Sequence, residues 1–279
     1  MRVGLSGAEG FIAPWFAEML GEELVIIDED DLKVSRKLDA KLAQCTTLIH
    51  LNGHSRGSET DRNSPDSVDR VRNDAKSILD AKNRHQGLHV LMIGSLRVHR
   101  YEKEESYYSG TGLSPRDSAA EGQLWGEERA LEYASDTHPV SIIRASNIQG
   151  LSLESSQGHG VIHSFVNQAN FGWIGVPGDG QDLLDPIHIT DFIGAIMTVV
   201  EKPPPTRETI AIGGGQPAPI IEIANAISTK LNCEIQLWDN EDNFVLGQVD
   251  EWEMKERLEF KPEVSIEDMI IEAIEALNS

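Results

Sequence analysis

The opening of the chain constrains its fold more than any other stretch. A short apolar segment, residues 3–5, runs into Gly7 and Gly10, and apolar residues at 14–20 then predict a helix. Gly7 allows a sharp turn, and Gly10 removes the Cβ that would keep a pyrophosphate away from the backbone. The first-turn amides of the helix would point at that pyrophosphate. A strand, a glycine turn and a helix in this order predict a dinucleotide-binding site.

The next apolar segment adds a second part of such a site. Residues 24–27 predict a strand that ends on Asp28. An acid about twenty residues after the glycine turn can hold the hydroxyls of the adenosine ribose. A carboxylate there would also repel a 2′-phosphate, so it favours NAD over NADP. The alternative is a plain acid at a strand end, within the acidic run 28–31.

Strands and helices alternate along the rest of the chain. We expect strands at 46–51, 89–93, 140–144, 173–176 and 209–212, and helices at 68–83, 119–135, 161–169, 192–200, 219–231 and, after a Ser265 cap, to the C-terminus. Only a short helix fits between the second and third strands. This alternation predicts an α/β fold of the Rossmann type, a doubly wound parallel sheet with a smaller C-terminal α/β lobe. We assign residues 1–150 and about 186–202 to the dinucleotide-binding domain, and 151–185 and 203–279 to a substrate-binding lobe.

Charge and cysteine content exclude several classes of function. The chain has 24 basic and 46 acidic residues, a net charge of -22, which argues against binding to nucleic acid or to an anionic membrane. Cys45 and Cys233 lie far apart without a neighbouring Cys or His cluster, so neither a disulfide framework nor a metal site is expected. Without a signal peptide or a membrane-length apolar run, the expected location is the cytoplasm.

Several motifs, in order, resemble those of the extended short-chain dehydrogenase/reductase family of NAD-dependent epimerases, dehydratases and 4-keto-sugar reductases. They are the glycine turn at 7–13, the strand end at 49–53, the strand that ends at Ser95, and the segments 144–150, 178–180, 188–191, 209–215 and 260–262. The length and the short middle crossover look most like the dTDP-4-dehydrorhamnose reductase branch.

The resemblance implies NAD as the cofactor, a sugar or sugar-nucleotide substrate, no metal, and a homodimer that pairs through the helix at 119–135. Ser95 and Asn147 would contact the substrate, and Ser95 would hydrogen-bond the reacting hydroxyl or ketone. The residues implied for the cofactor are Gly7, Glu9, Gly10, Phe11, Ile12, Asp28, Asp31, Leu32, Leu51, Asn52, Gly53 and Gly94.

The chain departs from the family at the residues that transfer the proton. The family uses Tyr-x-x-x-Lys, a tyrosine whose pKa is lowered by the lysine. Aligning Glu128 with the family's downstream helix glutamate puts Ala120 at the tyrosine and Leu124 at the lysine. Neither side chain can move a proton.

Other departures bear on the substrate and on a replacement donor. Leu184 stands where the family commonly has an arginine for a substrate diphosphate. Tyr107 and Tyr108 could enter the cleft from the loop at 100–118 and supply the proton, or form an exposed loop pair. We interpret Glu127 and Glu128 as the solvated face of a helix, and His188 as a structural histidine.

Two functions therefore stay open. One is an NAD(P)-dependent sugar epimerase, dehydratase or reductase with an atypical proton donor. The other is a catalytically silent dinucleotide-binding sensor or regulatory subunit.

Overall fold

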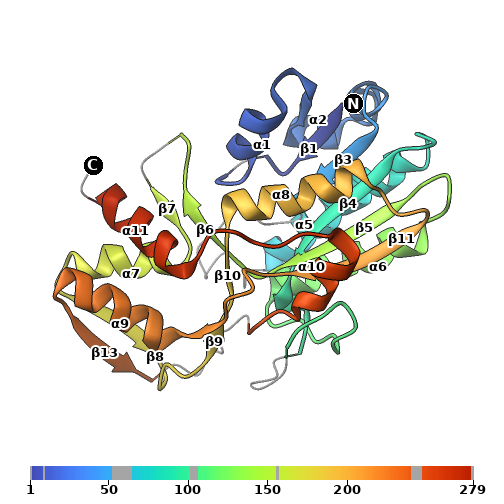
Figure 1. The fold of residues 1–279 in the computed structure, drawn as a ribbon. Helices are drawn as coiled ribbons and strands as arrows, with labels where there is room; N and C mark the ends of the chain where they lie inside the picture. Colours follow the sequence, from blue (N-terminus) through green and yellow to red (C-terminus); the bar gives the residue numbers. More distant parts are fainter. Residues whose placement is uncertain are drawn as a thin grey trace. The chain divides into compact units, whose positions relative to one another are not determined.

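The computed structural model describes residues 2–8, 10–51, 65–100, 106–154, 157–239 and 247–277, with only the backbone given for 65–67. The chain divides into two compact units (Figure 1). Unit 1 comprises residues 1–100, 111–145 and 195–210, and unit 2 comprises 101–110, 146–194 and 211–279. We expected the first domain to end at residue 150, whereas the corresponding segment of unit 1 ends at residue 145. Residues 186–194, expected in the dinucleotide-binding domain, belong to unit 2.

A parallel sheet forms the centre of unit 1. In the described part of the chain it has six strands in the order β11-β5-β4-β3-β1-β2, and the described pairings are parallel. The strands are β1 (Val3–Ser6), β2 (Leu24–Ile27), β3 (Thr47–His50), β4 (His89–Ser95), β5 (Val140–Ala145) and β11 (Arg207–Ile212). Since β1 pairs with both β2 and β3, the strand order reverses between β1 and β3, and ligands of such sheets bind at the carboxyl ends beside that point. The predicted doubly wound fold is confirmed.

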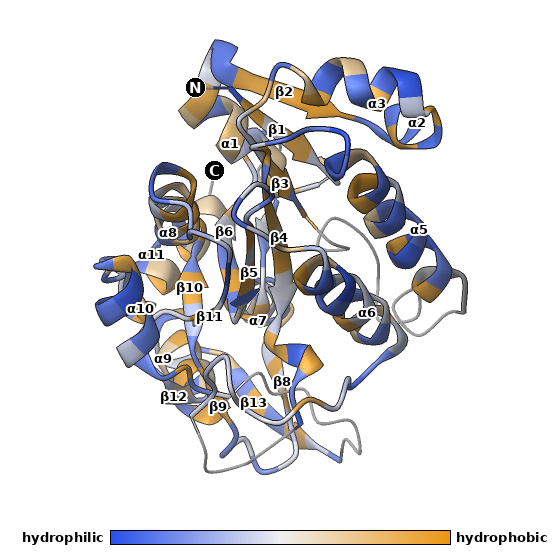
Figure 2. Cartoon of the chain, turned by 90° about the vertical axis from the view of Figure 1, so that its right-hand side faces the viewer, coloured by the Kyte–Doolittle hydropathy of each residue, from blue (hydrophilic) through white to orange (hydrophobic). Residues whose placement is uncertain are grey.

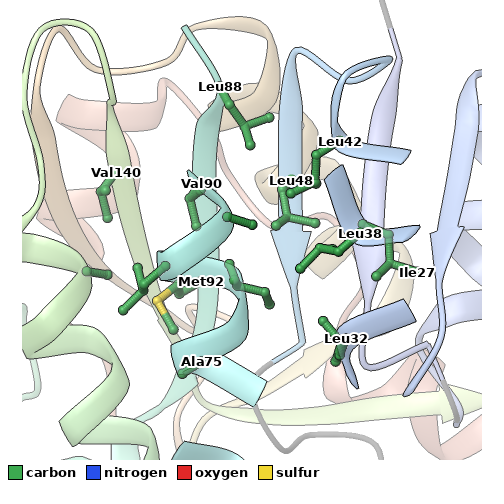
Figure 3. Close-up of a cluster of buried hydrophobic side chains, with 14 of the residues drawn as sticks. Ile27, Leu32, Leu38, Leu42, Leu48, Ala75, Leu88, Val90, Met92 and Val140 are labelled. Atoms are coloured by element: carbon green, nitrogen blue, oxygen red, sulfur yellow. The ribbon is translucent and has the colours of Figure 1, made fainter. Parts of the chain in front are cut away.

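Helices cover both faces of this sheet. On one face, α3 (Ser35–Leu42), α5 (Pro65–Lys82) and α6 (Ser118–Glu132) share a buried apolar core with the strands. Figure 3 shows part of that core, from Ile27 on β2 to Val140 on β5. On the opposite face lie α1 (Ala13–Leu20) and residues 195–201 of α8 (Ile189–Glu201), as Figure 2 shows. The central strands β1, β3 and β4 are buried along their whole length, which explains why they are mostly apolar without alternation.

The connection between β2 and β3 is short, as expected, but it holds two helices rather than one. They are α2 (Glu29–Lys33) and α3. Asp28 caps α2, because its side chain accepts from the amide of Asp31 while the Asp31 carboxylate accepts from the amide of Asp28. This capping box fixes Asp28 at the carboxyl end of β2.

Unit 2 is built from small sheets and helices around its own apolar core. The described strands are β6 (Asn147–Leu151), β7 (Gly158–His159) and β10 (Pro186–His188) in one sheet, with the pairs β8 (Trp173–Pro177) and β13 (Glu234–Trp238), and β9 (Leu183–Leu184) and β12 (Ala218–Pro219). The helices are α7 (Val161–Ala169), α9 (Ile220–Leu231), α10 (Glu251–Leu258) and α11 (Ile266–Leu277). The core is formed by α7, α9, α11 and β8.

Several expected elements are confirmed, and several others were missed. The helix at 161–169 has the predicted bounds. The last helix has the predicted cap, because the amide of Asp268 donates to Ser265 Oγ over 3.1 Å and the amide of Ser265 donates to Asp268 over 3.2 Å. Those missed include α10, β13 and the short strands β6, β7, β9, β10 and β12.

Within the described ranges, no helix combines the length and the apolar content needed to cross a bilayer. Both cysteines are free thiols.

Candidate functional site

The glycine turn after β1 has the geometry that the sequence predicts. Gly7 has φ +73° and Gly10 has φ +152°, and a side chain is strained in both conformations. A Cβ at Gly7 would also lie 2.9 Å from the carbonyl oxygen of Leu51, just beyond β3. The amide of Leu51 donates to the carbonyl of Ser6 over 2.9 Å. The turn is therefore pressed against the end of β3, at the point where the strand order reverses.

The helix after the turn is suited to an anion. No side chain caps the start of α1, and no acid lies in its first turn. The partial positive charge at this helix end is therefore not offset by a carboxylate of the first turn. Together with the missing Cβ atoms at Gly7 and Gly10, this arrangement fits the pyrophosphate of a dinucleotide.

Asp28 lies exposed at the end of β2. Its Oδ1 accepts from the Asp31 amide over 2.9 Å, so its other oxygen remains for the hydroxyls of a ribose. Asp31 and Leu32 have different surroundings. The Asp31 carboxylate is buried against the ammonium of Lys41; burial raises its pKa, but the Lys41 contact and the backbone bonds outweigh it and lower the pKa. Leu32 belongs to the core of unit 1.

Three further residues predicted to contact the cofactor lie among the described residues of unit 1. Ile12 and Leu51 are buried in unit 1, and Phe11 is half-buried. Glu9, Asn52, Gly53 and also His54 lie outside the described residues.

The two residues expected to contact the substrate lie in different units. Ser95, in unit 1, is buried at the end of β4, and its Oγ accepts from the amide of Arg97 over 3.3 Å. Asn147, in unit 2, is half-buried at the start of β6, with the side-chain amide of Gln149 donating to it.

A buried ion pair beneath Gly94 corrects one expectation. Glu127 is fully buried, not on the solvated face of α6, and Arg144 donates to its Oε2 over 3.0 and 2.9 Å. Burial raises the pKa of Glu127, and the Arg144 guanidinium opposes that shift. Glu127 Oε1 faces Gly94, where a Cβ would overlap with it.

His99 extends this buried cluster. Its Nδ1 donates to the Thr111 carbonyl over 3.0 Å, which leaves Nε2 to accept from Arg144 Nη1 at 3.3 Å. Burial, assisted by the charge of Arg144, lowers the pKa of His99 to about 4. His99 is therefore a neutral hydrogen-bond partner at neutral pH and not a proton donor.

The buried glutamate offers a second register for the comparison with Tyr-x-x-x-Lys. Glu128 is exposed, and Glu127 is the glutamate of α6 that is buried. Taking Glu127 as the reference places Ala119 at the tyrosine and Gln123 at the lysine, whereas Glu128 places Ala120 and Leu124 there. The chemical conclusion stands, since neither a methyl group nor an amide transfers a proton.

The two tyrosines of the following loop have unlike surroundings. Tyr107 is fully buried in unit 2, with its ring against Gly247 and its amide donating to the Gln248 carbonyl over 2.8 Å. The exposed-pair interpretation is therefore wrong for Tyr107. The side chain of Tyr108 is 47% exposed. A role for either as a proton donor stays a prediction.

A second polar cluster lies in unit 2. His188 Nε2 is 3.3 Å from Glu272 of α11, and its Nδ1 is 2.7 Å from Thr190 Oγ1. His163 Nε2 is 3.7 Å from the same carboxylate. Burial alone would raise the pKa of Glu272, but the two histidines outweigh it and lower the pKa to about 2. Among the described residues, no group of three or more His, Cys, Asp or Glu is placed to hold a metal ion.

Comparison with known proteins identifies the family. Residues 5–213 match the model of the "NAD dependent epimerase/dehydratase family". A match of 25% identity over 184 residues joins the chain to the "Uncharacterized UDP-glucose epimerase YtcB" of Bacillus subtilis (strain 168). That match covers 64% of this chain and 57% of the relative, a little over half of its length.

Solved structures share the fold across the whole chain. MoeE5, in complex with UDP-glucose and NAD, has a TM-score of 0.82 at 17% identity, over 100% of this chain and 99% of that one. The dTDP-glucose 4,6-dehydratase of Bacillus anthracis, in complex with NAD, has a TM-score of 0.80 at 18% identity, over 100% and 96%. The family model covers most of the sequence, and its NAD dependence agrees with the cofactor predicted from the glycine turn. The chain belongs to the NAD dependent epimerase/dehydratase family.

Proposed function

We propose that this protein binds NAD in unit 1 and converts a sugar or sugar-nucleotide type substrate by hydride transfer, as an epimerase, dehydratase or reductase. The observation that carries the proposal is the glycine turn where the strand order reverses, with Gly7 against the Leu51 carbonyl. Family membership supports it. Two relatives point the same way, since MoeE5 is described with UDP-glucose and NAD and YtcB is named a UDP-glucose epimerase.

The cofactor would be held by unit 1 at two places. The amides around Gly7 and Gly10 and the start of α1 suit the pyrophosphate. The free oxygen of Asp28 suits the hydroxyls of the adenosine ribose, and its charge disfavours the 2′-phosphate of NADP. NAD, when bound, would accept and return the hydride in an epimerase or dehydratase, and NADH would supply the hydride in a reductase.

Proton transfer would be atypical in this enzyme. Ser95 can hydrogen-bond a substrate hydroxyl or ketone. Gln123, on the same face of α6 as Glu127, offers amide hydrogen bonds but no titratable proton. Tyr108 is the better candidate for the donor, because its side chain is partly exposed whereas that of Tyr107 is enclosed by unit 2.

One observation favours a second function. In either register, Ala120 and Leu124 or Ala119 and Gln123, both residues of the family's proton-transfer pair are replaced, which suits a silent sensor or regulatory subunit that keeps only the dinucleotide. The two functions differ in turnover and not in NAD binding.

Turnover can be tested with protein loaded with NAD or with NADH and a panel of sugars, keto sugars and sugar nucleotides. Reduction of the bound nicotinamide is followed by NADH fluorescence, and products are followed by mass spectrometry. For an enzyme, Ser95→Ala should lower turnover about a hundredfold, the typical effect of losing one hydrogen-bond donor to the reacting oxygen. Ser164→Ala, at an exposed position on α7, is the matched control. Unchanged turnover in Ser95→Ala would remove Ser95 from the site, and NAD binding without any turnover would favour the silent protein.

A further inference from the structure

The negative charge of the chain is concentrated in unit 2. The sequence of unit 2 holds 5 Lys and Arg against 23 Asp and Glu, a net charge of -18. Unit 1 holds 19 against 23, a net charge of -4, and together these make the total of -22. Between Arg144 and Lys202 the sequence has no Lys or Arg. Unit 2 therefore provides few cationic side chains for an anionic ligand.

The basic residues that the structure describes in unit 2 lie on or next to α9 and α10. Lys230 pairs with Glu267 at 2.7 Å. Arg257 lies 3.8 Å from the buried carboxylate of Glu253. Lys255 and Lys261 are exposed, and Lys103, the fifth, lies outside the described residues. None of the described four belongs to the segment 146–194, which contributes β6 and β10 to this unit.

The helix ends of unit 2 are also occupied by groups of the chain itself. A helix N-terminus can bind an anion when its amides are open. In the described part of unit 2, five helices begin with an amide bonded to a side chain or carbonyl. These bonds are Ile162 to Gln149 (3.0 Å), Thr190 to His188 (3.4 Å), Ile220 to the Asp182 carbonyl (3.0 Å), Trp252 to Asp250 (3.0 Å) and Asp268 to Ser265 (3.1 Å). Four of these helices, α8, α9, α10 and α11, also carry acids in the first turn, unlike α1 of unit 1.

A glycine-rich loop of unit 2 is filled by a carboxylate of the chain. Successive backbone amides in such loops form anion-binding concavities. Here the buried Asp185 accepts from the amides of Val249 (3.1 Å) and Gln216 (3.2 Å), and the amides of Gly214 and Gly215 also donate to it. Burial raises the pKa of Asp185 to about 6, although these amides oppose that shift. The Asp185 carboxylate thus occupies the position in this loop that an anionic ligand would take.

Leu184, the residue before Asp185, also provides no group for an anionic ligand. Leu184 is buried and packs in the core of unit 2 with α7, α9 and α11. It offers an anion neither a charge nor a hydrogen bond.

We propose that the substrate of this protein carries no diphosphate and is a neutral or positively charged sugar-type compound. Proteins hold diphosphates with arginine, lysine and open helix ends. Unit 2 has only five such cations, the described ones all on or next to α9 and α10, and the described helix ends are capped. The field of a unit with net charge -18 would repel a nucleoside diphosphate and attract a cation such as an amino sugar. This inference rests on the proposed function, because it names the substrate class of that enzyme.

The test is a calorimetric titration of the NAD-loaded full chain with UDP, dTDP and UDP-glucose. We expect no saturable binding up to millimolar concentration at low ionic strength, where a cationic site would bind these anions best. Saturable binding of any of the three in the micromolar range would overturn the proposal. NAD titrated into the same preparation is the control, and its failure to bind would contradict the proposed function, a different result from nucleotide binding.

The salt dependence of binding provides a second measurement. Any weak affinity for UDP-glucose should stay constant or rise as salt is added, because salt screens the repulsion from unit 2. An affinity that falls steeply with salt indicates attraction by cationic side chains and would also overturn the proposal.

Discussion

At the scale of the single residue, Gly7 is the position where the site depends most on a missing side chain. Gly7→Ala would strain the backbone at φ +73° and bring Cβ to 2.9 Å from the Leu51 carbonyl. The strain alone costs roughly 1–2 kcal/mol, and the contact adds to it. We expect the free energy of unfolding, measured in urea, to fall by more than this and NAD affinity to fall with it.

Gly87→Ala is the control for this prediction. Gly87 has φ +83°, close to that of Gly7, and nothing lies within 4 Å of a Cβ there. The positive φ is shared and the contact is absent, so the difference between the two variants reports the contact with Leu51. Equal losses of stability would show that the turn is not pressed against β3.

Some residues of the site could be predicted from sequence and others could not. Gly7 and Asp28 were predictable because local chain conformation and strand order determine their places. Glu127 was assigned to the wrong face of its helix. The buried face of α6 includes two polar side chains, Gln123 and Glu127, and a pattern of apolar residues does not identify such positions as buried. Burial of Tyr107 depends on contact with residues 247–249, far along the chain.

At the scale of the element, the Glu127–Arg144 pair joins α6 to β5. Arg144→Met would leave a buried carboxylate without its cation, and we expect a loss of about 3–5 kcal/mol in the free energy of unfolding. Adding Glu127→Gln should recover part of that loss, because the uncompensated charge is gone. A double-mutant cycle in urea measures this coupling, and additive losses would contradict it.

The contact of α11 with His163 and His188 predicts a dependence of stability on pH. The pKa of Glu272 is lowered to about 2 from an ordinary value of 4.5. A depressed carboxyl pKa stabilises the fold above the unfolded pKa, and this stability is lost as pH falls through the folded pKa. Wild type should therefore exceed Glu272→Gln in stability at pH 5, with the difference shrinking toward pH 2. Urea unfolding at several pH values measures it, and a constant difference would refute the assignment.

Element prediction succeeded where local signals were strong. The helix α7 and the capping box of α11 follow from periodicity and from Ser265 with Asp268, which act within one turn. The strand β13 was missed because its side chains are mostly exposed on both faces, so that the sequence 234–238 shows no buried pattern. Its pairing with β8 joins segments about sixty residues apart, which local reasoning does not detect.

At the scale of the whole molecule, fold class followed from the order of elements along the chain, whereas the division of charge between the units did not. Unit 2 draws on three separate segments, 101–110, 146–194 and 211–279. Its net charge of -18 emerges only when these segments are assigned together. The overall value of -22 argues only against binding to nucleic acid or to an anionic membrane.

We expect the protein to bind NAD whether or not it turns over a substrate. The most direct test is a calorimetric titration of the full chain with NAD and with NADP, repeated on Asp28→Asn. Asparagine can still cap α2 but lacks the charge that meets the ribose hydroxyls. A hydrogen bond to a charged group contributes about 1.5–3 kcal/mol, so NAD should bind roughly ten- to a hundredfold more weakly to the variant.

We expect saturable NAD binding to wild type in the micromolar to millimolar range, weaker binding of NADP, and a smaller preference for NAD in Asp28→Asn. Failure of wild type to bind either dinucleotide would contradict the assignment of the glycine turn and Asp28 to an NAD site.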